Sequence, residues 1–483
     1  MRWQPRITVI GAGFGGLSTA IELTRAGYTD VTVLEKGDGV GGVWRENTYP
    51  NAACDVPSSL YSWSFAPNPE WPHRYSQQAE ILAYIERTAR ETGVRDLVRT
   101  GVEVASAAYD DDSRTWTLTT VGGEQVVTDV LVTAMGQLSR PAIPDLPGKD
   151  SFAGPAFHSA EWDHSVDLRG KRVAVLGTGA SAIQFVPGIA PEAGRVTVFQ
   201  RSAPYVAPKP DREYTRVHAR TFDRFPRTQR AGRELTWKVT ETFNKALIED
   251  TWLKKVVKAG WRAQLHAQVR DKELRAKLVP DYEFGCKRVL FSNAWYPALA
   301  RPDVDVVTSP VAEVLPHGVR DADGTVHEAD VIIYGTGFAA TEFLAPLRVT
   351  GSGGADLGEV WADGAHAYLG LCVPDFPNLF VVYGPNTNLG GSSIINMLEA
   401  ASSAITTLLT HTEHAGARAV AVRPQAEAAY DEEIQHRLAT SVWASCHNWY
   451  HQDNGRISTN WPGLVKEYQQ RCAELDLRDF VTS

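Results

Sequence analysis

The sequence predicts an α/β protein in which one strand–turn–helix–strand unit occurs twice, with the second copy inserted into the first. Three observations lead to this fold class. Two glycine-rich turns each follow an apolar strand and open a helix. Two similar apolar strands close the copies, and a long stretch without strand pattern interrupts the second copy.

The first copy is "RITVIGAGFGGLSTAIELTRAG" followed by "VTVLEKG". An apolar strand turns through Gly11, Gly13 and Gly16 into a helix, and the next strand ends at Glu35. Such glycines let the backbone approach a pyrophosphate, and the helix N-terminus offers it free N–H groups. An acid about twenty residues further on accepts hydrogen bonds from a ribose. The context predicts a Rossmann-like dinucleotide-binding domain.

The second copy is "KRVAVLGTGASAIQFVPGIA" followed by "RVTVFQRS". Gly177, Gly179 and Ala182 occupy the places of the three glycines, and Arg201 stands where the first copy has Glu35. A carboxylate suits a free ribose 2′-hydroxyl, whereas an arginine suits a 2′-phosphate. The sequence therefore predicts FAD in the first domain and NADPH in the second.

Two further residues are candidates for the same phosphate. Ser202 and Lys287 could add contacts to this 2′-phosphate. The alternative interpretation of Arg201 is a solvated side chain at the end of a strand.

Both copies end alike, in "DVLVTAMG" and "DVIIYGTG". The second copy is longer because it contains a helical insert, which is either a solvated face rich in Lys and Arg or a wall of a substrate cavity. A later strand, turn and helix, "NLFVVYGPNTNLGGSSIINMLEA", return the chain to the first domain. The predicted divisions are 1–150 and 338–483 for the FAD-binding domain, 151–210 and 285–337 for the NADPH-binding domain, and 211–284 for the insert.

Composition excludes several classes of protein. The net charge of −9 disfavours nucleic acid or an anionic membrane as a main partner. No apolar run approaches the roughly 20 residues of a membrane helix, and no signal segment precedes the first strand. The five scattered cysteines indicate reduced thiols in a cytoplasmic protein, and no Cys/His set has the spacing of a metal site. We expect a monomer or a small homo-oligomer.

The two cofactors limit the chemistry. A protein that binds both passes a hydride from the nicotinamide to the flavin, and the electrons then need an acceptor. A disulfide reductase would need a cysteine pair soon after the first domain's opening unit, and Cys54 is alone there. Molecular oxygen is the best remaining acceptor, which predicts a monooxygenase.

One stretch between the two domains identifies the type. "FAGPAFHSAEWD" resembles the fingerprint of the Baeyer–Villiger monooxygenases, with Phe152, Gly154, His158, Trp162 and Asp163 in place. The related N- and S-oxygenating flavin monooxygenases have a similar stretch but typically lack the Trp-Asp or Trp-Pro ending. The resemblance extends over nearly the whole chain.

A second family signature is "GGVWRENTYPNAACD". It resembles the family pattern at Gly42, Trp44, Tyr49, Pro50 and Asp55. Three positions depart from the pattern: Asn51 and Gly335 replace a usual Gly and Ala, and Met135 stands where Thr is common. "NTYPNAACDVPSSLYSWSF" and "YEFGCKRVL" look most like the branch that includes 4-hydroxyacetophenone monooxygenase, and the resemblance places Trp44, Asp55 and Tyr61 beside the flavin.

The resemblance also implies roles. In this family an Arg stabilises a flavin C4a-peroxide anion and an Asp positions that Arg; the matching residues are Arg288 and Asp55. A permanent cation with forked donors favours such an anion. Trp449 matches a family Trp near the nicotinamide and substrate. The implied reaction uses NADPH, FAD and O₂ to insert one oxygen atom next to a ketone carbonyl, which gives an ester or lactone.

Alternatives remain open at this point. His158 invites an acid–base role because its ordinary pKa is near neutrality, but we expect it to hold the linker between the domains. One rival function is N- or S-oxygenation. The other is a protein that consumes NADPH only to make peroxide or to sense redox state.

Overall fold

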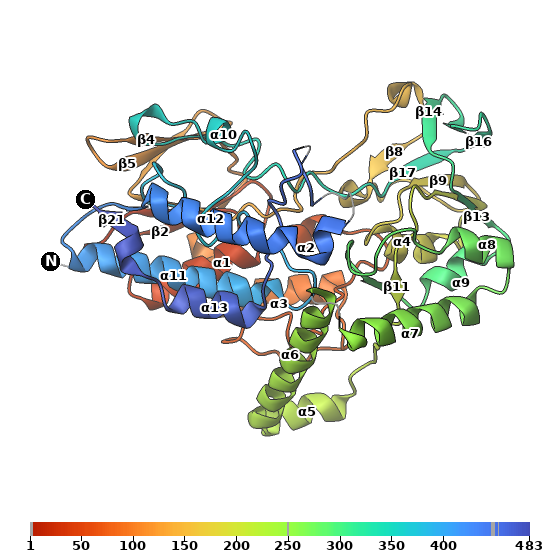
Figure 1. Ribbon diagram of the computed structural model, residues 1–483, viewed down its shortest axis with the longest axis horizontal. Coiled ribbons are helices and arrows are strands. Elements are labelled where there is room, and N and C mark those ends of the chain that lie inside the picture. The colour runs from red at the N-terminus through yellow and green to blue at the C-terminus, as the bar shows by residue number, and fades with distance from the viewer. Residues whose placement is uncertain (1–2, 249–250, 446–449, 453) are drawn as a thin grey trace.

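The computed structural model describes residues 3–248, 251–445, 450–452 and 454–483. Figure 1 shows two lobes side by side, with the helices α5 (Arg216–Arg224) and α6 (Pro226–Ile248) projecting from between them. Each lobe is built around one parallel five-stranded sheet.

The first sheet combines strands from both ends of the chain. Its order is β19 (Leu379–Val381), β7 (Val130–Thr133), β1 (Ile7–Ile10), β2 (Val31–Glu35) and β3 (Val98–Thr100). The chain leaves this sheet after β7 and returns only at β19, because the whole second sheet lies between them in the sequence. The predicted insertion of the second unit into the first is confirmed, while the limits of each domain stay a prediction.

The second sheet repeats the first. Its order is β13 (Val304–Val307), β10 (Arg195–Phe199), β9 (Arg172–Leu176), β17 (Val331–Tyr334) and β8 (Ala156–His158). Ile7 pairs with Val31 and Val130, and in the same way Val173 pairs with Val196 and Val331. The stretch expected to be a linker loop thus supplies β8, the edge strand beside β17.

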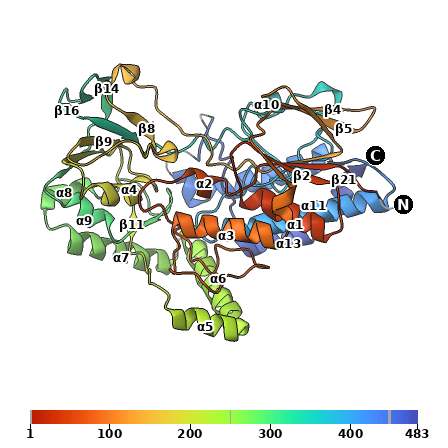
Figure 2. The same cartoon turned by 180° about the vertical axis from the view of Figure 1, so that it is seen from behind.

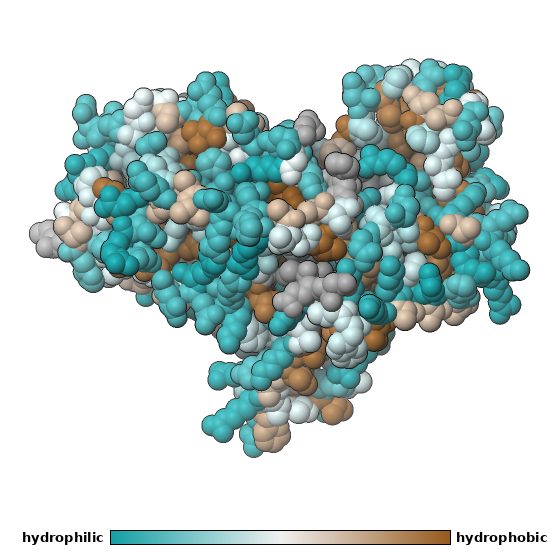
Figure 3. All heavy atoms as spheres, in the orientation of Figure 1, coloured by the Kyte–Doolittle hydropathy of each residue, from teal (hydrophilic) through white to brown (hydrophobic). Residues whose placement is uncertain are grey.

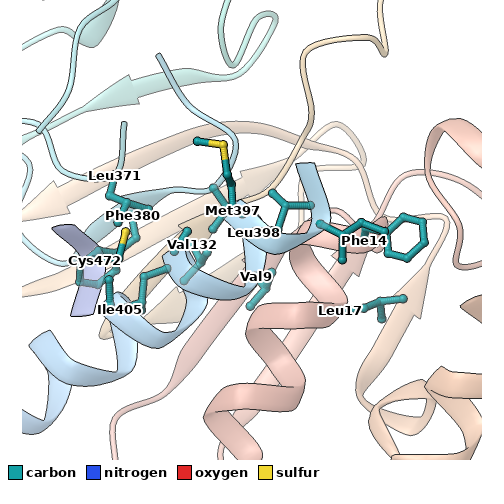
Figure 4. Packing of buried hydrophobic residues seen from close by; sticks show 14 of the residues in the cluster. Val9, Phe14, Leu17, Val132, Leu371, Phe380, Met397, Leu398, Ile405 and Cys472 are labelled. Atoms are coloured by element: carbon teal, nitrogen blue, oxygen red, sulfur yellow. The ribbon is translucent and has the colours of Figure 1, made fainter. Parts of the chain in front are cut away.

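Both faces of each sheet are covered, which is why the central strands β1, β7, β9 and β17 are mostly apolar and buried at nearly every position. On the first sheet, one face packs against helices, including α1 (Phe14–Arg25), α3 (Gln78–Glu91), α11 (Ile394–His414) and α13 (Val465–Ala473). Figure 4 shows Val9 and Val132 of the sheet between Leu17 of α1 and Ile405 of α11.

The other face of the first sheet lies under a small mixed sheet whose strands are β18 (Arg348–Thr350), β4 (Val104–Asp110), β5 (Thr115–Thr120) and β6 (Gln125–Thr128). In the second lobe the corresponding cover is the antiparallel sheet β14 (Val311–Leu315), β15 (Gly318–Asp321) and β16 (Val326–Glu328). The helical cover there consists of α4 (Ala182–Ile189), α7 (Trp252–Gln268) and α9 (Trp295–Leu299).

The remaining elements are short or peripheral. They are α2 (Val43–Glu46), β11 (Val206–Ala207), α8 (Lys272–Lys277), β12 (Leu290–Phe291), α10 (Leu357–Val360), β20 (Val420–Val422), α12 (Pro424–Ala439) and β21 (Phe480–Thr482).

The predicted helical insert forms α5 to α8 and touches both lobes. Trp261 of α7 is buried in the second lobe and donates a hydrogen bond to the hydroxyl of Tyr296 at 2.8 Å. Arg233 of α6 reaches the first lobe, where it donates to the carbonyls of Ser59 at 2.6 Å and Ser62 at 3.0 Å. Figure 2 shows α6 and α5 below α3 of that lobe. The insert therefore joins the lobes and is more than a solvated face.

The visible surface is mostly polar, with scattered apolar side chains, and its outline is notched between the two lobes (Figure 3). None of the described helices is both long and apolar enough to cross a membrane.

Candidate functional site

The first glycine-rich turn presents an open helix N-terminus. Gly11, Gly13 and Gly16 connect β1 to α1, and among the described residues no side chain caps α1 and no acid lies in its first turn. A Cβ atom on Gly13 would lie 3.6 Å from the Cα of Gly42, so two backbone segments come close here. Free N–H groups and the positive end of the helix dipole fit the pyrophosphate of a dinucleotide.

Glu35 lies at the end of β2 with its carboxylate held by the backbone. Its Oε2 accepts a hydrogen bond from the amide of Ala12 at 2.7 Å, and its Oε1 accepts one from Gly37 at 2.8 Å. An ionised carboxylate has about four acceptor positions, so two remain for ribose hydroxyls. The arrangement fits the ribose of FAD.

Trp44 and Tyr61 form one aromatic group beside this turn. The indole Nε1 of Trp44 donates to the hydroxyl of Tyr61 at 3.0 Å, and the Tyr61 ring meets Phe14, the first residue of α1, at 5.4 Å between centroids. Burial raises the pKa of Tyr61 well above its ordinary value, so its hydroxyl stays protonated. These rings can wall a flat ring system without adding charge.

The second turn is built like the first. Gly177 and Gly179 connect β9 to α4, whose N-terminus has neither a side-chain cap nor a first-turn acid in the described part of the chain. The third position is Ala182. A Cβ atom at Gly335 would lie 3.3 Å from the Cβ of Ala182, so the glycine at 335 makes room for that methyl group.

The other departures from the family pattern also have structural reasons. Asn51 adopts a φ of +61°, a left-handed conformation that Gly prefers and that Asn tolerates better than most residues. Met135 packs against the apolar cluster between the first sheet and the small mixed sheet. All three replacements suit their local backbone or packing.

Arg201, Ser202 and Lys287 come together beyond β10. The Nζ of Lys287 donates to the hydroxyl of Ser202 at 2.9 Å, and Arg201 is exposed. Burial, and then the charge of Arg201, lower the pKa of Lys287. Two cations that repel each other beside a hydroxyl fit a 2′-phosphate, because the phosphate would relieve that repulsion.

Asp55 and Arg288, which are far apart in the sequence, form a forked ion pair. The Nη2 of Arg288 lies 2.7 Å from each oxygen of Asp55, and its Nε lies 3.1 Å from Oδ2. The charge of Asp55 raises the pKa of Arg288 above its ordinary range, so the guanidinium is a permanent cation. Its side chain is 36% exposed, which leaves part of it open to a ligand.

Three residues near this pair were not predicted. Tyr383 and Tyr450 lie in the field of Arg288, and burial raises the pKa of each to about 12, so both phenols stay neutral. Gln184 of α4 donates to the carbonyl of Ala53 at 2.9 Å and accepts from its amide at 3.1 Å. The one sequence signal for Gln184 is a lone polar residue in the apolar helix "AIQFVPGI".

His158 is fully buried at the end of β8. Its Nδ1 accepts a hydrogen bond from the amide of Ala160 at 3.1 Å, and its ring meets Phe338 edge-on at 5.6 Å. Burial lowers the pKa of His158, so the imidazole is neutral. A neutral, packed ring favours the structural role.

The cysteines need one correction. Cys286 is disulfide-bonded, so the prediction that all five are reduced thiols is wrong there. Cys54, Cys372 and Cys472 are free and buried, and burial raises the pKa of Cys54 to about 12. Such a thiol is a poor nucleophile, which supports the exclusion of a dithiol route. Trp449 lies outside the described residues.

Known proteins resemble the chain along almost its entire length. It is 44% identical over 482 residues to a Baeyer–Villiger monooxygenase of Streptomyces coelicolor, covering 98% of this chain and 92% of that protein. It is 39% identical to a Baeyer–Villiger monooxygenase of Pseudomonas aeruginosa, covering 98% and 90%. The chain belongs to the Baeyer–Villiger monooxygenase family.

Solved structures agree with this membership. The structure of oxidised steroid monooxygenase bound to NADP matches with a TM-score of 0.88 at 30% identity, covering 99% of both chains. The OTEMO complex with FAD and NADP matches with a TM-score of 0.89 at 27% identity over the whole of both chains. Residues 8–269 also match the family model described as pyridine nucleotide-disulphide oxidoreductase.

Proposed function

We propose that this Baeyer–Villiger monooxygenase binds FAD and NADPH and inserts one atom of O₂ next to a ketone carbonyl. Ketone, O₂, NADPH and a proton give ester or lactone, NADP⁺ and water. The observation that carries the proposal is the forked pair of Asp55 and Arg288 in a chain of this family. When bound, FAD would supply the redox chemistry that activates O₂, with NADPH as the source of the electrons.

The chain's own residues divide the remaining work. Glu35 holds a ribose of FAD, and Arg201, Ser202 and Lys287 hold the 2′-phosphate of NADPH. Arg288 keeps a fixed positive charge where negative charge develops on oxygen, and a guanidinium does this without losing a proton. Asp55 fixes the plane of that guanidinium through its forked hydrogen bonds.

The finer assignments are proposals from the sequence. We propose aryl ketones as the first substrates to test, since two segments resemble the branch that includes 4-hydroxyacetophenone monooxygenase. Trp449 stays a proposed neighbour of the nicotinamide. A cytoplasmic location and a monomeric or small homo-oligomeric state also remain predictions.

The test is product analysis with the purified holoenzyme. Aryl, cyclic and linear ketones are supplied with NADPH, in parallel with amines and sulfides, and products are counted against NADPH consumed. Ester formation in near equal amount to NADPH supports the proposal. Products from amines or sulfides alone would indicate heteroatom oxygenation, and hydrogen peroxide alone would indicate an uncoupled oxidase.

A further inference from the structure

A group of buried polar atoms lies where α6 meets the turn before α11. Asn244 of α6 is 1% exposed, and within the described part of the chain neither its Oδ1 nor its Nδ2 has a hydrogen-bond partner. Ser393 is 0% exposed, and its hydroxyl is unpartnered in the same way. Buried polar groups are almost always paired, and an unpaired one costs stability.

Ser393 occupies a position at which a serine hydroxyl ordinarily has a hydrogen-bond partner. It is the N-cap residue of α11, where a serine oxygen ordinarily accepts a hydrogen bond from the first turn. Among the described residues its side chain makes no such bond. The hydroxyl is therefore available to another group.

The adjoining turn comes close to these atoms because two of its residues are glycines. A Cβ atom on Gly391 would lie 3.4 Å from the Oδ1 of Asn244, and one on Gly390 would lie 3.0 Å from the ring of Trp443. Trp443 is itself 2% exposed. The two glycines thus let the turn lie directly against the amide of Asn244 and the indole of Trp443, and a larger residue at either position would crowd these groups.

The same turn leads to Arg288. The hydroxyl of Tyr383, which lies in the field of Arg288, donates to the Oδ1 of Asn388 at 2.9 Å, just before Gly390. The carbonyl oxygen of Trp443 is 3.9 Å from the sulfur of Cys286, which precedes Lys287 and Arg288 in the chain. Tyr383 and Cys286 therefore link this turn and Trp443 to the part of the chain that carries Arg288.

The chemistry of these groups indicates a neutral ligand. An amide and a hydroxyl each donate and accept, and neither carries charge. Nearby Glu241 of α6 is 9% exposed, and burial raises its pKa, so the surroundings disfavour an added anion. The ring of Trp443 offers a flat apolar surface.

We propose that Asn244 and Ser393 form a subsite that binds a second, neutral oxygen-bearing group of the ketone, a hydroxyl or a carbonyl, while Trp443 contacts its apolar part. This inference rests on the proposed function, whose site it deepens. It selects ketones with a remote hydroxyl or carbonyl over the same ketones without one.

The test compares 4-(4-hydroxyphenyl)butan-2-one with 4-phenylbutan-2-one in the holoenzyme. The ring and two methylene groups separate the hydroxyl from the ketone, so both carbonyls have the same reactivity. Asn244→Leu and Ser393→Ala should each lower kcat/KM for the hydroxylated ketone by about tenfold, the value of one lost hydrogen bond, and change the other by less than about twofold. Equal losses on both ketones, or none, would overturn the subsite.

A binding measurement separates this inference from the proposed function. The corresponding alcohols carry no ketone, yet the hydroxyphenyl alcohol should raise the melting temperature of the holoenzyme more than the phenyl alcohol does, and either variant should abolish the difference. If no ketone is oxygenated but this difference persists, the proposed function fails and the subsite stands. Loss of FAD from Asn244→Leu with unchanged discrimination would instead assign these atoms to the cofactor and overturn the subsite.

Ser402→Ala is the matched control. Ser402 lies in the same helix and is equally buried, but its hydroxyl donates to the carbonyl of Leu398 at 2.8 Å and lies 3.0 Å from the hydroxyl of Thr19. Its loss should lower the melting temperature and leave the preference between the two ketones unchanged. Ser393→Ala should lower the preference for the hydroxylated ketone and should not lower the melting temperature. A drop in preference in both variants would mean that helix α11, and no specific hydroxyl, sets it.

Discussion

Arg288 combines two properties that an oxygenating site needs. Its charge is permanent, and its forked contact with Asp55 fixes the orientation of the guanidinium. Lysine would keep the charge but would lose the fork, and asparagine at 55 would keep one acceptor but lose the negative charge. Substitutions at these two residues can therefore distinguish the effect of the charge from the effect of the orientation of the guanidinium.

Arg288→Ala should uncouple the enzyme. Removing a preorganised electrostatic group costs on the order of 10²–10³ in rate, so ester formation should fall by at least about 100-fold while NADPH oxidation continues. The ester formed per NADPH consumed by Arg288→Lys and by Asp55→Asn should lie between the values for the wild type and for Arg288→Ala. Ester and hydrogen peroxide are measured per NADPH consumed. Arg301→Ala, which breaks a similar forked pair with Asp303, is the control and should change neither. Retained coupling in Arg288→Ala would contradict the role.

Arg201 should set the choice between NADPH and NADH. A hydrogen bond to a charged group contributes about 1.5–3 kcal/mol, so Arg201→Ala should raise KM for NADPH by roughly 10- to 100-fold and leave KM for NADH almost unchanged. Steady-state kinetics with both coenzymes measure this. Arg195→Ala is the control, because Arg195 lies at the start of β10 and pairs with Asp305. Equal effects on both coenzymes would indicate a general disturbance of the strand.

At the level of elements, the sequence predicts a feature correctly where the residues that determine it are close together in the chain. The strand–turn–helix motifs and the residues at the end of each second strand are contained in short segments, so Glu35 and Arg201 could be named directly. Gln184, Tyr383 and Asn244 could not be, because what matters for each is a contact with a segment far away in the chain. Asp55 and Arg288 were found only through the family resemblance, for the same reason.

The linker strand β8 should make stability depend on pH through His158. Burial lowers the pKa of His158 in the folded protein, whereas the unfolded value is about 6.5. The unfolded chain therefore binds the proton first, so the contribution of His158 is fully present above about pH 6.5 and is lost as the pH falls toward the folded pKa. His158→Gln should flatten this acid limb and keep oxygenation.

Melting temperatures between about pH 5 and 8 check this expectation. His366 provides an internal contrast, since a hydrogen bond to Glu427 at 2.7 Å raises its pKa. Its contribution is fully present below its unfolded pKa and is lost as the pH rises through the folded one. Loss of oxygenation in His158→Gln, together with a step near neutral pH in the wild-type rate, would show an acid–base role.

At the scale of the whole molecule, the two lobes must act on one substrate although each binds its own nucleotide. They are joined by the crossing segments, by the insert, and by Gln184 at their contact. Gln184 of α4 holds Ala53 by two hydrogen bonds and lies 3.2 Å from the hydroxyl of Tyr49. Helix α4, which follows the glycine-rich turn of the NADPH lobe, is therefore hydrogen-bonded to the segment that carries Asp55.

Gln184→Leu should weaken the coupling between the lobes without removing either nucleotide site. Each lost hydrogen bond is worth about 1 kcal/mol, and Asp55 loses the anchor of its segment. We expect NADPH to reduce the flavin at nearly the normal rate, while ester per NADPH falls several-fold and hydrogen peroxide rises. Gln264→Leu is the control, because Gln264 bonds to the carbonyl of Ser292 at 2.8 Å within the second lobe and its flanking insert.

Unfolding gives an independent measurement of the same coupling. Release of FAD, followed by its fluorescence, and loss of helix, followed by circular dichroism, should coincide in the wild type and separate in Gln184→Leu. NADP⁺ at about 100 times its Kd adds about 2.7 kcal/mol to whatever unfolds together with its site. It should therefore delay FAD release in the wild type and in Gln264→Leu, but not in Gln184→Leu. Delay in all three proteins would mean that the crossings and the insert suffice to couple the lobes, and Gln184 would then be only one contact among many.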